Sequence, residues 1–298
     1  MYHEIADDKD DIEAWTVVKK SNFIKQMEYL RNNFNVVSLE DGIDLMGNSS
    51  HIKGPTAVVT FDDGYPGNAR ILLPILKSMN IPSTIFVSTK AVQDQEIYWY
   101  DKLINAFQSE KVIEINLNHL SLECYQINRC KGARNWMEIQ RLLTDLKTLD
   151  ACRRGKLVED IIRNLNTPHK KASYNITPLT INDLHELANC SLITIGAHSH
   201  NHEILPRLSE DDARESIQKS RELLESWINR RVYFFSYPNG NYNDNVIKIL
   251  KENGFQCSLT TMSGSWEKGD SVFKIPRIGI GRYDSLDDFK IRVSGIIC

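Results

Sequence analysis

The sequence lacks the features that mark membrane and exported proteins. It contains no apolar run of the length needed to cross a bilayer. Residues 1–11 are polar and acidic, so they supply neither the basic region nor the apolar region of a secretory signal. We therefore expect no transmembrane segment and a cytoplasmic location, although an exported protein whose leader had been removed would read the same.

Cysteine pairs and excess positive charge are missing as well. None of the six cysteines belongs to a CxxC pair, and without an export signal we expect them to be reduced. The net charge is -3, so the chain has no overall basic footprint and nucleic acid is not the expected partner. With 41% hydrophobic and 25% charged residues, the composition is that of an ordinary globular protein.

What the sequence does contain is an alternation of apolar strands and amphipathic helices. We expect strands at residues 36–39, 56–61, 83–87, 192–197, 232–237, 255–260 and 272–280. We expect helices at residues 23–34, 69–79, 180–188, 209–228 and 245–253. This order predicts parallel βα units and therefore an α/β fold.

One segment interrupts this alternation. Residues 100–174 are polar, rich in Lys, Arg and Asn, and mostly helical in pattern. We interpret them as a helical insertion or lid, not as a second catalytic domain. The whole chain, residues 1–298, is then a single domain, which is a usual size for a barrel.

Two adjacent carboxylates follow the first long apolar strand. Asp62 and Asp63 come directly after residues 56–61, and Gly64 follows them. In βα folds the carboxyl ends of the strands form the functional face, and neighbouring carboxylates there need a cation or a proton to compensate them. The alternative is a plain turn with a helix cap, because Asp and Gly suit turns.

A histidine cluster follows a later strand. His198, His200 and His202 place three of the chain's eight histidines within five residues. Imidazole is the commonest metal ligand, and a spacing of four residues can bring His198 and His202 onto one face of a helical turn. His200 would then point elsewhere. An exposed polar loop with incidental histidines is the alternative interpretation.

Together these residues suggest a catalytic metal centre. One carboxylate, Asp63, and two imidazoles, His198 and His202, leave coordination positions open, as catalytic sites do. A metal there would lower the pKa of a water molecule and polarise a carbonyl. The second carboxylate, Asp62, can then act as the general base.

The two motifs resemble those of the polysaccharide deacetylases, the carbohydrate esterase family 4 enzymes that share the NodB homology domain. The matching residues are the run 60–64 (TFDDG) and the His-Ser-x-x-His run at 198–202. The resemblance implies a distorted (β/α) barrel of the NodB type. It implies one divalent metal, zinc in most members and cobalt or nickel in some, held by the Asp-His-His set. It also implies a hydrolase that removes acetyl groups from N-acetylated sugars.

A third segment fits the same family pattern with changes. Residues 235–240 (FSYPNG) resemble a substrate-binding motif that includes Tyr237 and Pro238, and the backbone N–H of Asn239 would donate to the oxyanion. Many members carry an arginine that orients the base at the position of Ser236. We expect Arg277 to supply that guanidinium, the alternative being a surface ion pair.

The family's late Leu-x-His segment, which carries the general acid, is absent here. Residues 2–5 (YHEI) resemble the opening of the subgroup that deacetylates poly-N-acetylglucosamine, where an early histidine protonates the leaving amine. His3 is therefore the candidate acid. The apolar residues that usually precede this motif are missing, so the alternative is a frayed end that holds His3 poorly.

Aromatic residues open the insertion. Trp99, Tyr100 and Asp101 are candidates to line a sugar groove, or else to anchor the insertion to the barrel. The predicted substrate is an N-acetylated sugar, whether polymeric, lipid-linked or nucleotide-linked, and the motifs do not fix the oligomeric state. Two other functions stay open: a metal-dependent glycosyltransferase that uses the two aspartates, and a degenerate carbohydrate-binding homologue.

Overall fold

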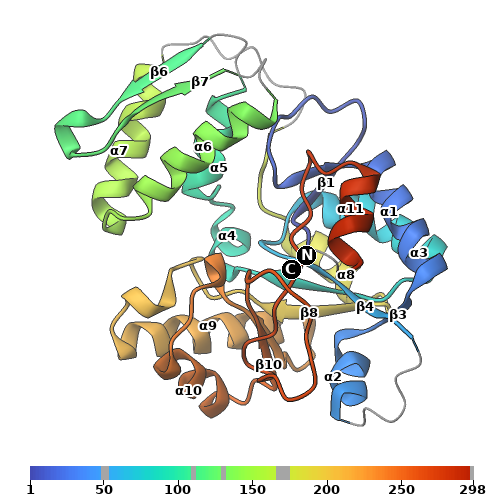
Figure 1. The fold of residues 1–298 in the computed structure, drawn as a ribbon. Helices are drawn as coiled ribbons and strands as arrows, with labels where there is room; N and C mark the ends of the chain where they lie inside the picture. Colours follow the sequence, from blue (N-terminus) through green and yellow to red (C-terminus); the bar gives the residue numbers. More distant parts are fainter. Residues whose placement is uncertain (48–53, 109–111, 129–131, 166–174, 296–298) are drawn as a thin grey trace.

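A parallel sheet of six strands forms the centre of the protein in the computed structural model (Figure 1). The structure describes residues 1–47, 54–108, 112–128, 132–165 and 175–295. Every neighbouring pair of strands in this sheet is parallel. In spatial order the strands are β10 (Cys257–Leu259), β9 (Phe234–Ser236), β8 (Ile193–Ala197), β5 (Ser83–Val87), β4 (Thr56–Phe61) and β3 (Asn35–Val37).

The sheet curls into a half-barrel, and two further segments span the gap between its edges. Tyr2 pairs in parallel with Phe61 at the end of β4. The backbone nitrogen of Met1 donates to the segment 275–280, which in turn pairs with Leu259 of β10. Main-chain contacts therefore run from β4 round to β10 at the end where the strands finish. The predicted distorted (β/α) barrel is confirmed.

One expected strand is wrong. Residues 272–280 run beside β10 but form only an isolated bridge, between Ile275 and Leu259. Pro276 follows at once and has no N–H to continue a ladder, so the segment stays extended without becoming a strand. The other six predicted strands are present, most of them shorter at one or both ends than expected.

Helices cover the outside of the barrel, and several begin at caps that the sequence indicates. Thr180 and Asp183 form a capping box at one helix, and Ser209 caps another by accepting from the N–H of Asp212. The barrel helices are α1 (Lys20–Asn33), α2 (Leu39–Gly47), α3 (Leu73–Met79, preceded by a π-helical turn at Asn68–Leu72), α4 (Thr89–Asp94), α8 (Ile181–Ala188), α9 (Glu210–Ile228), α10 (Asp244–Glu252) and α11 (Leu286–Val293). The pattern analysis missed α2, α4 and α11.

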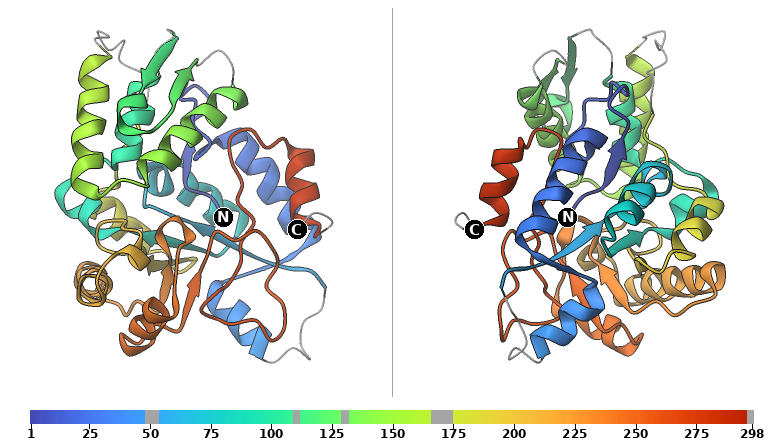
Figure 2. Two further views of the ribbon diagram at one scale, coloured as in Figure 1. Left: turned by 60° about the vertical axis from the view of Figure 1, so that its left-hand side comes forward. Right: turned by 90° about the vertical axis from the view of Figure 1, so that its right-hand side faces the viewer.

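The insertion stands over the strand ends of the barrel, as the two views of Figure 2 show. It is not purely helical, because it contains an antiparallel hairpin whose short strands alternate buried and exposed residues. Its elements are α5 (Trp99–Ala106), β6 (Ile113–Asn116), β7 (Cys124–Ile127), α6 (Ala133–Leu146) and α7 (Ala151–Asn164). Their buried apolar residues form a second cluster, distinct from the main barrel core, that also takes in Ala6, Ile12, Val17, Tyr65 and Ala91 of the barrel part.

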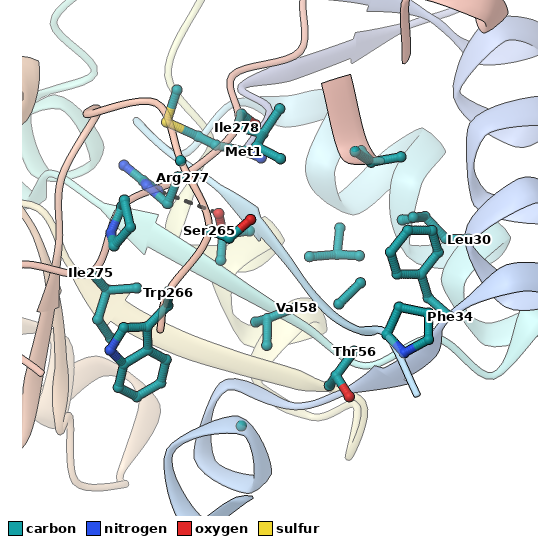
Figure 3. Close-up of a pocket in the computed structure, with 18 of the residues that line it drawn as sticks. Met1, Leu30, Phe34, Thr56, Val58, Ser265, Trp266, Ile275, Arg277 and Ile278 are labelled. Carbon is teal, nitrogen blue, oxygen red and sulfur yellow. Dashed lines mark hydrogen bonds between the residues drawn. The ribbon is translucent and has the colours of Figure 1, made fainter. Parts of the chain in front are cut away.

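An apolar cavity of about 470 Å³ lies between β4 and the segment 275–280 (Figure 3). Phe34 lines it at one end and Trp266 at the other, with Val58 of β4 between them. Arg277 contributes to this cavity and also to the one described below, so it separates the two. In the described ranges, no helix is both long and apolar enough to cross a bilayer.

The described cysteines carry no disulfide. Cys124, Cys152, Cys190 and Cys257 are all free thiols. The other two, Cys130 and Cys298, lie outside the described residues. Two more short strands, β1 (Glu4–Ala6) and β2 (Val17–Lys19), pair in parallel near the start of the chain and lead into α1.

Candidate active site

The structure brings the three predicted metal ligands together at the strand ends. Asp63 follows β4, and His198 follows β8, two positions along the sheet. The Nε2 atoms of His198 and His202 each lie 3.2 Å from Oδ1 of Asp63. The three ligand atoms all lie within 4.8 Å of one another, close enough to share one cation.

The chemistry of these atoms fits a divalent metal. Nδ1 of His198 lies 2.7 Å from the carbonyl oxygen of Ser236. Because a carbonyl can only accept, Nδ1 carries the hydrogen and Nε2 presents its lone pair to the site. Oδ1 of Asp63 is buried and has no hydrogen-bond partner among the described residues. A buried carboxylate oxygen facing two imidazole nitrogens is a donor set that fits a divalent metal ion.

The other oxygen of Asp63 is held by tyrosines. Oδ2 accepts from the hydroxyls of Tyr65 at 3.0 Å and Tyr100 at 3.2 Å. The hydroxyl of Tyr98 donates to the backbone oxygen of Asp63 at 2.7 Å. Burial opposes ionisation of Asp63, but His202 and His198 outweigh it and hold the pKa of this carboxyl well below its usual range. The carboxylate is therefore ionised and fixed in one orientation.

Two of the three ligands sit in a strained backbone conformation. Asp63 has φ of 74° and His202 has φ of 51°. A non-glycine residue in this left-handed region costs about 1–3 kcal/mol and persists only where the surrounding structure enforces it. The strain turns both side chains into the site, which a relaxed strand or helix would not do.

The second aspartate forms a buried ion pair. Arg277 donates to both carboxylate oxygens of Asp62, at 2.8 and 2.6 Å, and the hydroxyl of Ser236 donates to the same carboxylate at 3.1 Å. Burial alone would raise the pKa of Asp62, but the charge and hydrogen bonds of Arg277 outweigh it and lower this pKa to about 2. Arg277 thus takes the place of the arginine that Ser236 replaces. A surface ion pair is ruled out, since both partners are buried.

His3 is held firmly beside these groups. Tyr2 donates from its backbone N–H to Thr60, and the side chain of Asn68 donates to the backbone oxygen of His3. The carboxylate of Glu4 accepts from the N–H of Gly67, which ties the next residue down as well. These contacts speak against the alternative of a frayed end that holds His3 poorly. Burial lowers the pKa of His3, while the charges of Asp63 and Asp62 oppose that shift.

A cavity of about 560 Å³ collects these residues. The barrel contributes the three ligand candidates together with Asp62, His3 and Arg277. The insertion contributes a wall that includes Trp99, Trp136, Lys147 and Arg154. The insertion therefore forms part of the site itself.

The loop after β9 also reaches the cavity, through one residue. Asn239 lines the cavity with φ of 57°, and no described residue accepts a hydrogen bond from its backbone N–H. Tyr237, in contrast, is fully buried, and its hydroxyl donates to Phe273. Pro238 is buried too. Neither reaches the substrate side, so their part is to shape the loop that presents Asn239.

Among the candidates at the start of the insertion, Trp99 and Tyr100 line the cavity and Asp101 does not. Asp101 is only 1% exposed and lies 2.8 Å from the hydroxyl of Tyr65. Burial, and then the charge of Asp63, raise the pKa of Asp101 well above its usual range. Its place is behind the metal ligands, where it anchors Tyr65, and it does not meet a sugar.

This geometry agrees with the sequence comparisons. The sequence model of the polysaccharide deacetylase family matches residues 50–142 and 169–258, which together make up more than half of the chain. The chain belongs to the polysaccharide deacetylase family. Both matched ranges carry the predicted ligands, Asp63 in the first and His198 and His202 in the second.

Individual proteins similar to this deacetylase family member are deacetylases by name as well. It is 24% identical over 102 residues to "Putative polysaccharide deacetylase YxkH" of Bacillus subtilis (strain 168), and that match spans 34% of this chain and 36% of YxkH. The deacetylase PplD of Streptococcus pyogenes, solved with acetate, has a TM-score of 0.63 at 16% identity and covers 98% of this chain and 96% of its own. IcaB from Ammonifex degensii has a TM-score of 0.63 at 17% identity, over 98% and 94% of the two chains. The two structures share the fold.

Several residues of the site were not found by sequence reasoning. Tyr65 stands two positions after Asp63, in a place where a turn residue is expected. Lys147 and Arg154 lie in the insertion, within a polar region where no charge stands out from its neighbours. Only the folding of the insertion over the strand ends brings them to the metal ligands of this family member.

Proposed function

We propose that the protein is a metal-dependent N-deacetylase that removes acetyl groups from an N-acetylated amino sugar or a glycan built from it. One observation carries the proposal: an Asp-His-His donor set and a separate ionised carboxylate, Asp62, face the same cavity. The family supports the reaction type. Membership of a deacetylase family also argues against a glycosyltransferase. A glycosyltransferase would give His198 and His202 no role.

Each residue then has a chemical task. When bound, a divalent metal such as Zn²⁺ would lower the pKa of a water molecule and polarise the acetyl carbonyl. Asp62 accepts a proton from the attacking water as its oxygen bonds to the carbonyl carbon. The N–H of Asn239 donates to the oxygen that gains charge. His3 donates a proton to the nitrogen as the C–N bond breaks, which yields acetate and an amino sugar.

The test measures acetate and metal together. Purified protein is loaded with zinc, incubated with N-acetylglucosamine oligomers, and assayed for released acetate and bound metal. Asp62→Asn should abolish acetate release while zinc stays bound, because Asp62 is not a ligand. Full activity in Asp62→Asn would rule out the assigned base. Bound zinc with no acetate from any acetylated sugar would favour the degenerate carbohydrate-binding homologue.

A further inference from the structure

Three cations line the site cavity and the cavity beside it, Lys147 and Arg154 the first, Arg154 and Arg207 the second. Lys147 follows α6, Arg154 belongs to α7, and Arg207 ends the short 3₁₀ helix at Leu205–Arg207. Arg207 donates to the backbone oxygen of Lys147. Arg154 stacks over the ring of Trp99, with its guanidinium carbon 4.9 Å from the ring centre. We refer to Lys147, Arg154 and Arg207 as the cationic cluster.

The members of the cationic cluster repel one another. Burial lowers the pKa of Lys147; the charge of Asp63 opposes this shift, and the charges of Arg154 and Arg207 add to it. Burial and then the charge of Arg207 lower the pKa of Arg154. Within the described part of the chain, none of the three forms an ion pair with a carboxylate. Three cations without a direct carboxylate partner repel one another, and an anion bound among them would relieve that repulsion.

The carboxylates nearby are occupied by other partners. Glu96 pairs with Lys90 at 3.4 Å, and Glu159 pairs with Lys102 at 3.3 Å. Asp150 caps α7 by accepting from the backbone N–H of Arg153. Glu203 also has partners. Its carboxylate accepts hydrogen bonds from the hydroxyls of Ser199 and Ser216 and from the backbone N–H of Asn201. Each of these acids is thus engaged elsewhere, and although the charges of Asp63 and Asp150 act on Lys147 and Arg154, the pKa of both cations stays lowered.

The cationic cluster is close to the reacting groups. Lys147 and Arg154 line the same cavity as Asp62 and Asp63, and the charge of Asp63 acts on the pKa of Lys147. Lys147 also donates to the side chain of Asn239. A second cavity of about 420 Å³ adjoins the first and contains Arg207. The two cavities together have room for more than one sugar unit. A unit linked to the acetylated sugar would then lie next to the cationic cluster.

We infer that the cationic cluster binds an anionic group, a carboxylate or a phosphate, carried by the substrate beside the acetylated sugar. The inference rests on the proposed function. Deacetylation produces an ammonium group, so a polymer of amino sugars would place cations against these cations and be repelled. A sugar next to a uronate or a phosphate would instead pair with guanidinium and ammonium groups, which are the usual partners of both anions.

Binding measurements test this without relying on turnover. Calorimetry on zinc-loaded Asp62→Asn protein compares neutral N,N′-diacetylchitobiose with two anionic probes. One is the disaccharide of glucuronic acid and N-acetylglucosamine, and the other is N-acetylglucosamine 1-phosphate. At least one anionic probe should bind about tenfold more tightly than the neutral sugar, with a preference that falls as salt is raised. The probe that binds more tightly identifies carboxylate or phosphate as the ligand.

Variants locate the effect. In the same background Lys147→Met and Arg154→Gln should each reduce the preference for the anionic probe by about fivefold or more, since a charge-assisted contact is lost. Lys147→Arg should keep it. The matched control is Arg153→Gln on α7, whose side chain is 82% exposed and pairs with Asp150. This control removes one positive charge next to Arg154 and should leave the preference unchanged.

The outcomes separate the two proposals. Equal affinity for neutral and anionic probes, or a preference that survives both Lys147→Met and Arg154→Gln, would overturn the anion site. Acetate release from the neutral sugar by unaltered protein would then still support the deacetylase. A preference that both variants abolish supports the anion site. If, in addition, no acetylated sugar is hydrolysed, only the proposed deacetylase function is rejected.

Discussion

The guanidinium of Arg277 holds both carboxylate oxygens of Asp62, at distances of 2.8 and 2.6 Å. The two residues are 215 positions apart, and Arg277 reaches the site from the extended segment 275–280, which runs beside β10 and contacts Met1. The position that would carry an arginine in many relatives holds Ser236, whose hydroxyl lies between the two charged groups. The same charge pair is therefore built from a different part of the chain.

Replacing Arg277 should move the acid limb of the activity profile. The pKa of Asp62 falls from its ordinary 3.8 to about 2 on folding. The carboxylate therefore stabilises the folded state at pH values above 3.8, where it is ionised in the folded and the unfolded state alike. This stabilisation is lost as the pH falls from 3.8 towards 2. In Arg277→Met the largest influence that lowers this pKa is lost, so burial, opposed by His198 and His3, moves the pKa of Asp62 upward. The acid limb of kcat/KM should therefore shift to higher pH, and the loss at neutral pH should be about hundredfold because the base is misplaced.

The same change should weaken the fold. Removing one partner of a buried ion pair costs about 3–5 kcal/mol, measurable as a lower free energy of unfolding in urea. Arg214→Met, which breaks exposed ion pairs only, is the control and should cost about 1 kcal/mol or less. An acid limb that stays in place in Arg277→Met would show that Asp62 does not depend on Arg277.

Tyr65→Phe should weaken metal binding without touching a ligand. Its hydroxyl contacts Oδ2 of Asp63 and also Asp101, so its loss frees the carboxylate to rotate. Partners behind metal ligands typically contribute about 10- to 100-fold in affinity. Competition with a fluorescent zinc chelator measures the change, and Tyr233→Phe, which is exposed, serves as control. Unchanged zinc affinity in Tyr65→Phe would show that the hydroxyl does not orient Asp63.

Asp101→Asn should stabilise the protein increasingly as pH rises. Burial raises the pKa of Asp101 well above 3.8, so the folded state binds this proton more tightly than the unfolded state. As the pH rises above 3.8, the free energy of unfolding therefore decreases, and it goes on decreasing until the pH passes the pKa of Asp101 in the folded protein. An amide carries no such cost. Urea unfolding at pH 5 and pH 8 should show a larger gain at pH 8, whereas Asp44→Asn, on the surface, should show none. An equal effect at both pH values would contradict the raised pKa.

His3→Gln should separate amide from ester hydrolysis. A general acid matters when the leaving group is a poor one, as an amine is, and much less when it is a stable phenolate. Acetate release from an N-acetylated sugar should fall about 10²- to 10⁴-fold, while hydrolysis of 4-nitrophenyl acetate should change by less than about fivefold. Equal losses on both substrates would instead indicate that His3 supports the structure of the site.

The convergence of the candidate ligands could be predicted because their positions are set by local sequence. Asp63 and His198 each follow an apolar strand, and parallel strands end on one face of a sheet. Asp62 follows the same logic. Arg277 was within reach as well, because Ser236 leaves a carboxylate without its usual partner and buried carboxylates need one.

The insertion could not be predicted in the same way. The strands β6 and β7 have four residues each, too few for their alternation to stand out from a polar background. Lys147 and Arg154 reach the site only because α6 and α7 pack over the strand ends, a contact that depends on the insertion's own apolar core. For a related reason the sequence left two roles open for Asp101, and its contact with Tyr65 fits the anchoring one, since only tertiary packing decides which side of α5 faces the cavity.

Zinc should stabilise the protein through His202 and not through its neighbour His200. A ligand at 100 times its Kd adds about 2.7 kcal/mol to the free energy of unfolding, which raises Tm by several degrees in a chain of this size. His202→Ala removes a ligand atom and should abolish the difference in Tm between zinc-loaded and chelator-treated protein. His200→Ala should keep it, because Nδ1 of His200 bonds to the hydroxyl of Thr89, outside the ligand set. The Tm of the zinc-loaded protein is compared with that of the chelator-treated protein of the same variant. Any effect of the substitution on the stability of the metal-free protein then cancels. A zinc shift that survives in His202→Ala, or disappears in His200→Ala, would mean that the cation is held by other atoms than the three that converge here.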